Sequence, residues 1–233
     1  MSAKPRLIFK PLFSQSGVAV CDCAVFFDFD NTITLFDVLD EVIKKFAVDG
    51  DWAVFEDAWR RGRIGSRECL EGQLRSVRVT KDRLLKYLRG VEVDPYFHKL
   101  LCMLKEQGVE PVILSDSFSF MIDTVMRNNG IKRMKIYANS MRFYKDKIIP
   151  AFPYTNRLCS KCANCKKAHI APNNPQNKTV VYIGDGLSDV CPASVSGLVF
   201  AKQNLAAYLK KADLPSVEIK DLSEIYKHFR EEK

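Results

Sequence analysis

Two carboxylates separated by one residue give the chain its first recognisable chemistry. Asp28 and Asp30 follow the apolar run 24–27, in the segment DFDNTIT. Strand side chains alternate between faces, so both carboxylates project to one side near the strand's C-terminal end. Two such groups repel each other unless a cation lies between them or one stays protonated. The pair predicts a cation site with acid–base chemistry or, as the plainer alternative, a turn stabilised by an aspartate cap.

Three later segments place more polar groups at or after predicted strand ends. Ser115 ends an apolar run, and its hydroxyl with the free N–H groups of the next helix suits a phosphate. Asp185 and Asp189 lie in the segment GDGLSD, and between these segments stand Lys166 and Lys167, of which spacing alone selects neither. Ligands of open α/β sheets bind at the carboxyl ends of strands, so these segments predict one site.

The elements that must position these residues are short apolar runs alternating with helical patterns. Strands are predicted at 24–27, 111–114, 179–183 and 198–201, with a weaker one at 135–138. Helices are predicted at 118–129, 187–196, 204–212 and 221–230. Continuous apolar strands that alternate with helices indicate a parallel sheet covered on both faces. The fold class is therefore α/β, a doubly wound, Rossmann-like parallel sheet.

A long gap separates the first strand from the second. Helical patterns occupy 36–47, 51–61, 66–77 and 81–89, and no convincing strand lies among them. The simplest interpretation is a small helical cap inserted above the sheet. We thus expect residues 1–35 and 95–233 to form the α/β core domain and residues 36–94 to form the cap.

The ordered segments resemble a known family. DFDNT, the strand-end Ser115, a lysine and GDGLSD are similar to the four motifs of the haloacid dehalogenase superfamily of phosphohydrolases. The helical insert resembles the C1-type cap of its subclass IB, so the resemblance covers nearly the whole chain. Phospho-accepting response regulators also carry an early aspartate, but they lack an acid two residues after it, and Asp30 argues against them. The resemblance implies Mg²⁺-dependent hydrolysis of a phosphate monoester through an aspartyl-phosphate.

The resemblance also implies a role for each motif residue. Asp28 would be the nucleophile and Asp30 the general acid and base. Lys166, which directly follows a cysteine as in related phosphatases, would neutralise charge on the phosphoryl group. The phosphate would be bound by Thr32, Ser115, Asp116, Lys166 and Gly186. Mg²⁺ would be held by Asp28, the backbone carbonyl of Asp30, and Asp185, with Asp189 supporting its water shell.

The segment before Lys166, together with GDGLSDVCPA, narrows the resemblance to one branch. That branch contains the 2-hydroxy-3-keto-5-methylthiopentenyl-1-phosphate phosphatase of methionine salvage, the phosphoethanolamine/phosphocholine phosphatases and the pyridoxal phosphate phosphatases. Phosphoserine phosphatase is a cousin with the same cap type. The implied partner is a small phosphorylated metabolite. Asp37 stands where phosphoserine phosphatases carry a substrate-binding Glu, and it either contacts the substrate or caps a helix. An ungapped match places Leu74 at their substrate-binding cap Arg, which disfavours phosphoserine.

Three cysteines with regular spacing precede the lysine pair. Cys159, Cys162 and Cys165 form C-x2-C-x2-C, and His169 follows four residues later. Soft ligands so close together predict a structural zinc site. The alternative is a group of reduced thiols that pack the loop near the active site.

Composition limits the class of protein and its partners. The 36 basic and 28 acidic residues give a net charge of +8, and much of the excess lies in 131–178. A basic region attracts anions, so a nucleic-acid-binding or scaffold protein is the alternative from another class. Such a protein would not need Asp28, Asp30 and Asp185 together. No apolar run approaches a membrane span and the start is not a signal peptide, so we expect a cytoplasmic protein. We expect it to be a monomer or a homodimer.

Overall fold

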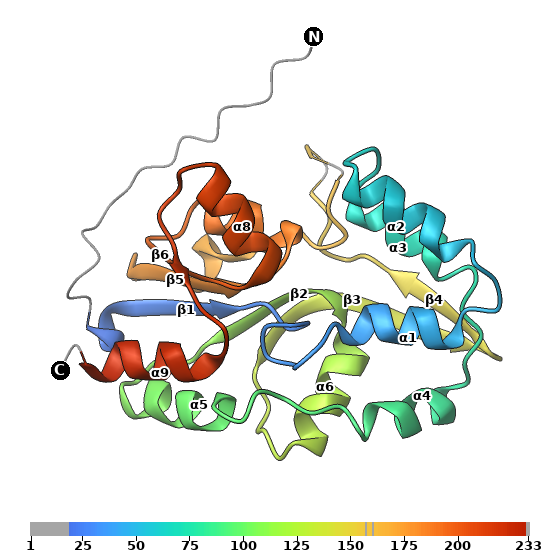
Figure 1. Ribbon diagram of the computed structural model, residues 1–233. Helices are drawn as coiled ribbons and strands as arrows, with labels where there is room; N and C mark the ends of the chain where they lie inside the picture. Colours follow the sequence, from blue (N-terminus) through green and yellow to red (C-terminus); the bar gives the residue numbers. More distant parts are fainter. Residues whose placement is uncertain (1–18, 157, 160, 232–233) are drawn as a thin grey trace, which may run out of the picture.

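The computed structural model describes residues 19–156, 158–159 and 161–231. The described residues form a seven-stranded sheet in the order β4-β3-β2-β1-β5-β6-β7 (Figure 1). The strands are β1 Cys23–Phe27, β2 Val112–Phe118, β3 Lys135–Tyr144, β4 Lys147–Ala151, β5 Thr179–Gly184, β6 Leu198–Ala201 and β7 Val217–Glu218. All neighbours are parallel except β3 and β4. The predicted doubly wound α/β fold is confirmed.

The central strand β1 shows why its sequence is apolar throughout. Phe26 and Phe27 are both buried, yet they belong to different apolar clusters because successive side chains face opposite sides of the sheet. Phe27 packs edge to face on Phe97 of α5 (Phe97–Glu106), with ring centroids 5.6 Å apart. Helix α9 (Leu222–Glu231) lies beside α5 below the sheet, and α8 (Gln203–Lys211) lies above it (Figure 1). Both faces are therefore covered.

Four helices stand between β1 and α5, as the sequence predicts. They are α1 Val38–Phe46, α2 Trp52–Arg60, α3 Ser66–Gln73 and α4 Lys81–Leu88. Side chains of Asp37 and Thr80 cap the starts of α1 and α4 by accepting backbone N–H groups one turn later. The buried apolar residues of α1 and α4 join the same cluster as those of the sheet. The boundaries 36–94 of the cap stay a prediction.

Several elements differ from the sequence-based expectation. Strand β3 continues to Tyr144 and turns through Lys145, which has a positive φ of 54°, into β4. The sequence did not predict β4 or β7, because these edge strands are short or partly exposed and lack a continuous apolar run. The helix predicted at 187–196 is a 3₁₀ turn, η4 (Leu187–Asp189), and a single α-helical turn, α7 (Val190–Ala193). None of the helices in the described ranges is long and apolar enough to cross a membrane.

Candidate active site

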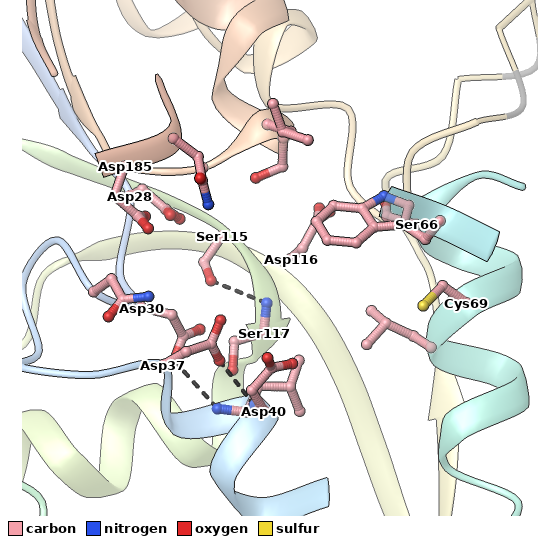
Figure 2. Close-up of a pocket in the computed structure, with 18 of the residues that line it drawn as sticks. Asp28, Asp30, Asp37, Asp40, Ser66, Cys69, Ser115, Asp116, Ser117 and Asp185 are labelled. Atoms are coloured by element: carbon pink, nitrogen blue, oxygen red, sulfur yellow. Dashed lines mark hydrogen bonds between the residues drawn. The ribbon is translucent and has the colours of Figure 1, made fainter. Parts of the chain in front are cut away.

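The four sequence motifs meet at the carboxyl ends of β1, β2 and β5, where a cavity of about 600 Å³ opens toward α1 and α3 (Figure 2). Eight of the predicted site residues line it: Asp28, Asp30, Asp37, Ser115, Asp116, Lys166, Asp185 and Gly186. Thr32 and Asp189 are fully buried behind the wall. The Thr32 hydroxyl lies 3.4 Å from Oδ1 of Asp185. The fold thus gathers the predicted catalytic and phosphate-binding residues in one place.

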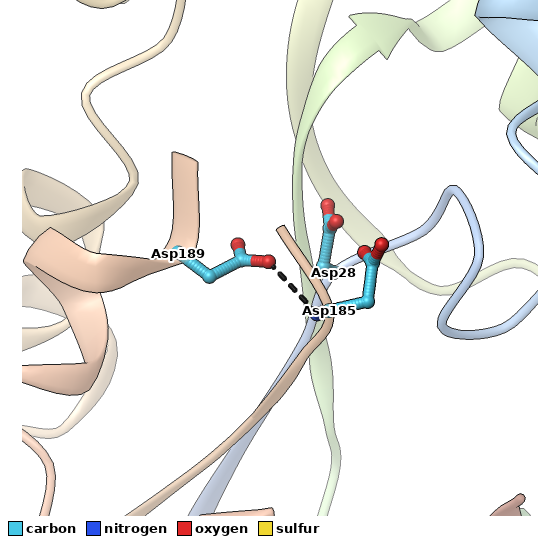
Figure 3. Close-up of side chains that lie close together, drawn as sticks. All are labelled: Asp28, Asp185 and Asp189. Atoms are coloured by element: carbon cyan, nitrogen blue, oxygen red, sulfur yellow. Dashed lines mark hydrogen bonds between the residues drawn. The ribbon is translucent and has the colours of Figure 1, made fainter. Parts of the chain in front are cut away.

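Three buried carboxylates meet at the floor of the cavity: Asp28 and Asp185 line it, and Asp189 lies behind them. One oxygen from each of Asp28, Asp185 and Asp189 lies within 4.8 Å of the other two (Figure 3). Burial and then the charge of Asp189 raise the pKa of Asp28 well above its usual value, and the same causes raise the pKa of Asp185 to about 7. Carboxylates that repel each other in a buried place are stabilised by a cation, and an all-oxygen donor set fits Mg²⁺.

Among the described residues, Lys166 is the one cation that forms ion pairs with these carboxylates. It begins the 3₁₀ helix η2 (Lys166–His169) and is only 3% exposed, whereas Lys167 is exposed. Its Nζ donates to Oδ1 of Asp189 at 2.6 Å and to Oδ1 of Asp28 at 2.8 Å. Burial alone lowers the pKa of Lys166, but the charges of Asp189 and Asp28 outweigh it and the net pKa is raised. The geometry therefore favours Lys166 over Lys167 as the catalytic lysine.

Both carboxylate oxygens of Asp189 are engaged by protein donors. Oδ1 accepts from Lys166 and from the Tyr182 hydroxyl at 2.6 Å, while Oδ2 accepts the N–H groups of Asp185 and Gly186 at 3.0 Å. A Cβ at Gly184 would lie 2.6 Å from Oδ2, so only glycine leaves room for this carboxylate. Asp189 consequently holds the loop after β5 and orients Lys166, and Tyr182 is a partner that no motif predicted.

Asp30 lies at the entrance to α1. Its Oδ1 accepts the N–H groups of Val38 at 2.9 Å and Leu39 at 3.4 Å. Burial and the nearby charge of Asp37 raise its pKa well above the usual value, although these hydrogen bonds act in the opposite direction. Asp30 therefore retains a proton more readily than an exposed aspartate, which suits a general acid. Asp28 instead lies beside Lys166 and the cation site, whose positive charges favour its ionised form. The two carboxyls can therefore hold opposite protonation states.

The cap side of the cavity is acidic. Asp37 both caps α1, accepting the N–H of Asp40 at 2.8 Å, and lines the cavity, so it fits both alternatives left open by the sequence. Burial and then the charges of Asp37 and Glu56 raise the pKa of Asp40 to about 7. The Ser117 hydroxyl is buried beside this wall with no hydrogen-bond partner among the described residues (Figure 2). Asp40, Glu56 and Ser117 carry no motif that could have predicted them.

The raised pKa of Asp40 predicts a pH-dependent stability. Its folded pKa of about 7 exceeds the usual 3.8, so the folded state binds the proton more tightly than the unfolded chain. This group's contribution to the free energy of unfolding is greatest below about pH 4 and falls as the pH rises through 7. Asp40→Asn should therefore raise the free energy of unfolding more at pH 8 than at pH 5. The difference between the two effects should be on the order of 1 kcal/mol. Urea unfolding at both pH values tests this, with the exposed Asp82→Asn as control, and an equal effect at both pH values would contradict it.

The predicted zinc site is not supported. In the ranges that the structure describes, the three aspartates are the only group of three or more possible metal ligands drawn together. Cys159, Cys162 and Cys165 do not form such a group with His169. The imidazole of His169 is used elsewhere: its Nε2 lies 2.8 Å from Oδ1 of Asn164, and its ring stacks on Tyr137 at 4.1 Å. The regular spacing placed the ligands together in sequence, but the fold gives the histidine another partner.

Comparisons with known proteins indicate a phosphatase. A family model described as Putative Phosphatase matches residues 23–206. The 2-hydroxy-3-keto-5-methylthiopentenyl-1-phosphate phosphatase of Brevibacillus brevis is 25% identical over 82% of this chain and 87% of its own. The enzyme of that name from Microcystis aeruginosa is 27% identical over 86% of this chain and 94% of its own.

Solved structures share the fold. A substrate-bound phosphoserine phosphatase superposes with a TM-score of 0.67 at 18% identity, covering 88% of this chain and 97% of the other. The family match and these relatives define a phosphatase, and its fold and ordered motifs are similar to those of the haloacid dehalogenase class. The chain belongs to the putative phosphatase family, whose model matches most of its length. The alternative of a nucleic-acid-binding protein without enzymatic chemistry is thereby set aside.

Proposed function

We propose that this protein is a Mg²⁺-dependent phosphatase that hydrolyses a small phosphate monoester through an aspartyl-phosphate on Asp28. The observation that carries the proposal is the pairing of Asp28 with the buried Lys166 at a three-carboxylate site on the cavity floor. With Lys166 on one side and Mg²⁺ held by Asp185 on the other, the two positive charges would oppose the effect of burial and keep Asp28 ionised for attack on phosphorus.

Each residue then has a defined task. Asp28 attacks phosphorus, and Asp30 protonates the oxygen of the leaving group and later takes a proton from the hydrolytic water. Lys166 and Ser115 bind oxygens of the phosphoryl group, with Thr32 behind them. Mg²⁺ would be held by Asp28, Asp185 and the backbone carbonyl of Asp30, and when bound it supplies positive charge against the phosphate. The N–H of Asp116, next to Ser115, is a further donor for a phosphate oxygen, whereas the N–H of Gly186 is donated to Asp189 and Gly186 only lines the cavity.

The first candidate substrate is 2-hydroxy-3-keto-5-methylthiopentenyl-1-phosphate. Relatives of that name match 82% and 86% of this chain, and 87% and 94% of their own length. The cavity wall also offers apolar surface for an alkyl tail, from Leu39, Trp59, Cys69 and Leu70. The phosphate of this substrate would lie on the polar cavity floor, and its apolar tail would lie against the apolar wall toward α2 and α3.

The acidic cap wall favours a second candidate, a phosphate ester whose leaving group carries an ammonium ion. Asp37, Asp40 and Glu56 line the cavity opposite the floor, and Glu56 is paired with Arg60 at 2.6 Å. Asp40 is paired with Lys44 at 4.0 Å. The cap wall nevertheless has four acids, Asp37, Asp40, Glu41 and Glu56, against the two cations Lys44 and Arg60, so an excess of negative charge faces the cavity. A positively charged group on the substrate would relieve it, as in phosphoethanolamine or phosphocholine.

One assay separates the candidates. Release of inorganic phosphate is measured for the methylthiopentenyl phosphate, phosphoethanolamine, phosphocholine, phosphoserine and pyridoxal phosphate, each with Mg²⁺ and with chelator. We expect turnover only with Mg²⁺. Preference for the methylthiopentenyl ester supports the first candidate, and preference for an ammonium ester supports the second. Absence of release from all five esters would contradict the proposed function.

Metal binding should also be visible without catalysis. Mg²⁺ at about 100 times its dissociation constant should stabilise the folded protein by about 2.7 kcal/mol, because it binds only the folded arrangement of carboxylates. Asp185→Asn removes a ligand and should abolish this stabilisation, whereas the exposed Asp213→Asn should retain it. Thermal unfolding with Mg²⁺ and with chelator measures both variants. An equal Mg²⁺ response in the two would remove Asp185 from the metal site.

A further inference from the structure

Asn164, a residue outside the catalytic motifs, has every polar group bonded and is 1% exposed. Its Nδ2 donates to the carbonyl of Ser115 at 2.9 Å and to that of Tyr137 at 2.8 Å. These two bonds attach the loop before η2 to β2 and β3. Since Nδ2 is the donor, Oδ1 is the acceptor, and the neighbouring Nε2 of His169 must carry its proton. Burial lowers the pKa of His169, so a neutral ring with that proton fits.

The backbone of Asn164 positions the backbone of Lys166. Its carbonyl accepts the N–H of Lys166 at 2.9 Å, and the intervening Cys165 has φ −77° and ψ 77°. This is an inverse γ-turn, which reverses the chain within three residues. Anchoring Asn164 to two strands therefore fixes the starting point of the Lys166 side chain, whose Nζ reaches Asp28.

The same segment is attached to the helical insert. Ser66, the first residue of α3, accepts the N–H of Ala163 at 2.9 Å through its hydroxyl, and it also hydrogen-bonds the side chain of Asp116. The Asp116 carboxylate in turn accepts the N–H of Asn164 at 3.0 Å. Figure 2 shows Ser66 and Asp116 lying on the same side of the cavity.

Close packing reinforces this junction. A Cβ at Gly65 would collide with the backbone of Lys161, so glycine is required where α3 begins. The N–H of Arg67 also lies 3.5 Å from the Lys161 carbonyl. The start of α3 is therefore fitted against the loop that delivers Lys166.

We propose that Asn164 and Ser66 are positioning residues that link the seating of α3 to the placement of Lys166 beside Asp28. Neither residue needs to touch the phosphate. The chain of contacts runs from Ser66 to Ala163 and Asp116, from Asp116 to Asn164, and from Asn164 through the γ-turn to Lys166. This inference rests on the role proposed above for Lys166.

Asn164→Ala tests the strand-side anchor. We expect kcat to fall about 100-fold with a change in KM below about threefold, because a small displacement of a catalytic group costs about that factor. Asn129→Ala is a matched control: its Nδ2 also donates to two backbone carbonyls, of Val91 at 2.8 Å and Val125 at 2.9 Å, at the far end of α6 (Ser119–Asn128). It should lose comparable stability with no loss of kcat. Equal kcat in the two variants overturns the proposal.

Ser66 tests the link to α3 and guards against an Asn164 variant that fails to fold. Ser66→Ala should lower kcat about tenfold, the cost of one hydrogen bond, while Ser66→Thr keeps the hydroxyl and should retain activity. If the two residues act through one path, the loss in Ser66→Ala/Asn164→Ala should be smaller than the product of the single losses. Independent, multiplicative losses overturn the link. A wild-type protein that cleaves no ester instead defeats the proposed function itself, and with it this inference.

Discussion

Replacing Asp28 by asparagine should abolish phosphate release without unfolding the protein. The amide is not a nucleophile toward phosphorus, so kcat should fall by at least about 10⁴-fold, as for other enzymes that lose the attacking group. Asparagine retains an oxygen that can accept from Nζ of Lys166, now 2.8 Å from the Asp28 carboxylate. It also removes one of three buried carboxylates that repel each other. Without Mg²⁺, the variant should therefore melt at the same temperature as the wild type or higher.

Two measurements check this prediction together. Phosphate release on the best ester of the panel gives the loss of activity, and thermal unfolding in chelator gives the stability. The exposed Asp22→Asn serves as control and should match the wild type in both. Turnover by Asp28→Asn above a hundredth of the wild-type rate would exclude Asp28 as the nucleophile.

Replacing Lys166 by methionine should damage both stability and activity, whereas the same change at Lys167 should affect neither. Lys166 bridges Asp28 and Asp189, and its removal leaves two buried carboxylates without their cation. Breaking a buried ion pair by deleting one partner costs about 3–5 kcal/mol. The phosphoryl group also loses a positive charge in a buried site, which should lower kcat by about 10³-fold.

The adjacent lysine makes this a sharply controlled experiment. Lys167 is exposed, so Lys167→Met should change the free energy of unfolding by less than about 0.5 kcal/mol. Urea unfolding and phosphate release are measured for both variants, with and without Mg²⁺, because bound metal should recover part of the stability of Lys166→Met. Comparable effects of the two substitutions would contradict the assignment of Lys166.

The parts of the site that the sequence predicted are those with local signals. Asp28, Ser115 and Asp185 each follow a short continuous apolar run, and such runs between helical patterns are typical of buried parallel strands. The carboxyl ends of adjacent parallel strands lie at one edge of the sheet, so these residues had to meet. The four inserted helices were predictable for the same reason, since α1 and α4 each carry a capping residue and an apolar stripe.

Other features depend on side-chain packing and hydrogen bonds that no sequence pattern specifies. Lys166 and Lys167 are adjacent in the sequence, which does not distinguish them. Packing of the loop against β2 and β3 buries Lys166 and leaves Lys167 exposed. The role of Asp189 beside the metal's water shell stays a prediction, and the structure adds that Tyr182 and Lys166 both donate to its Oδ1. His169 looked like a zinc ligand until the fold placed it on Asn164.

The sequence alone therefore determined the α/β class, the helical insert, the order of the motifs and the phosphatase chemistry that they imply. Those properties follow from hydrophobic periodicity and from residues at strand ends, which act over a few positions of the chain. The tertiary structure decided which lysine is buried, which oxygens of Asp189 are engaged, and how acidic the cap wall is. Burial and hydrogen bonds made when the segments pack together decide these properties, and no local pattern encodes them. The Lys166–Asp28 pair, 138 residues apart in the sequence, is the clearest case.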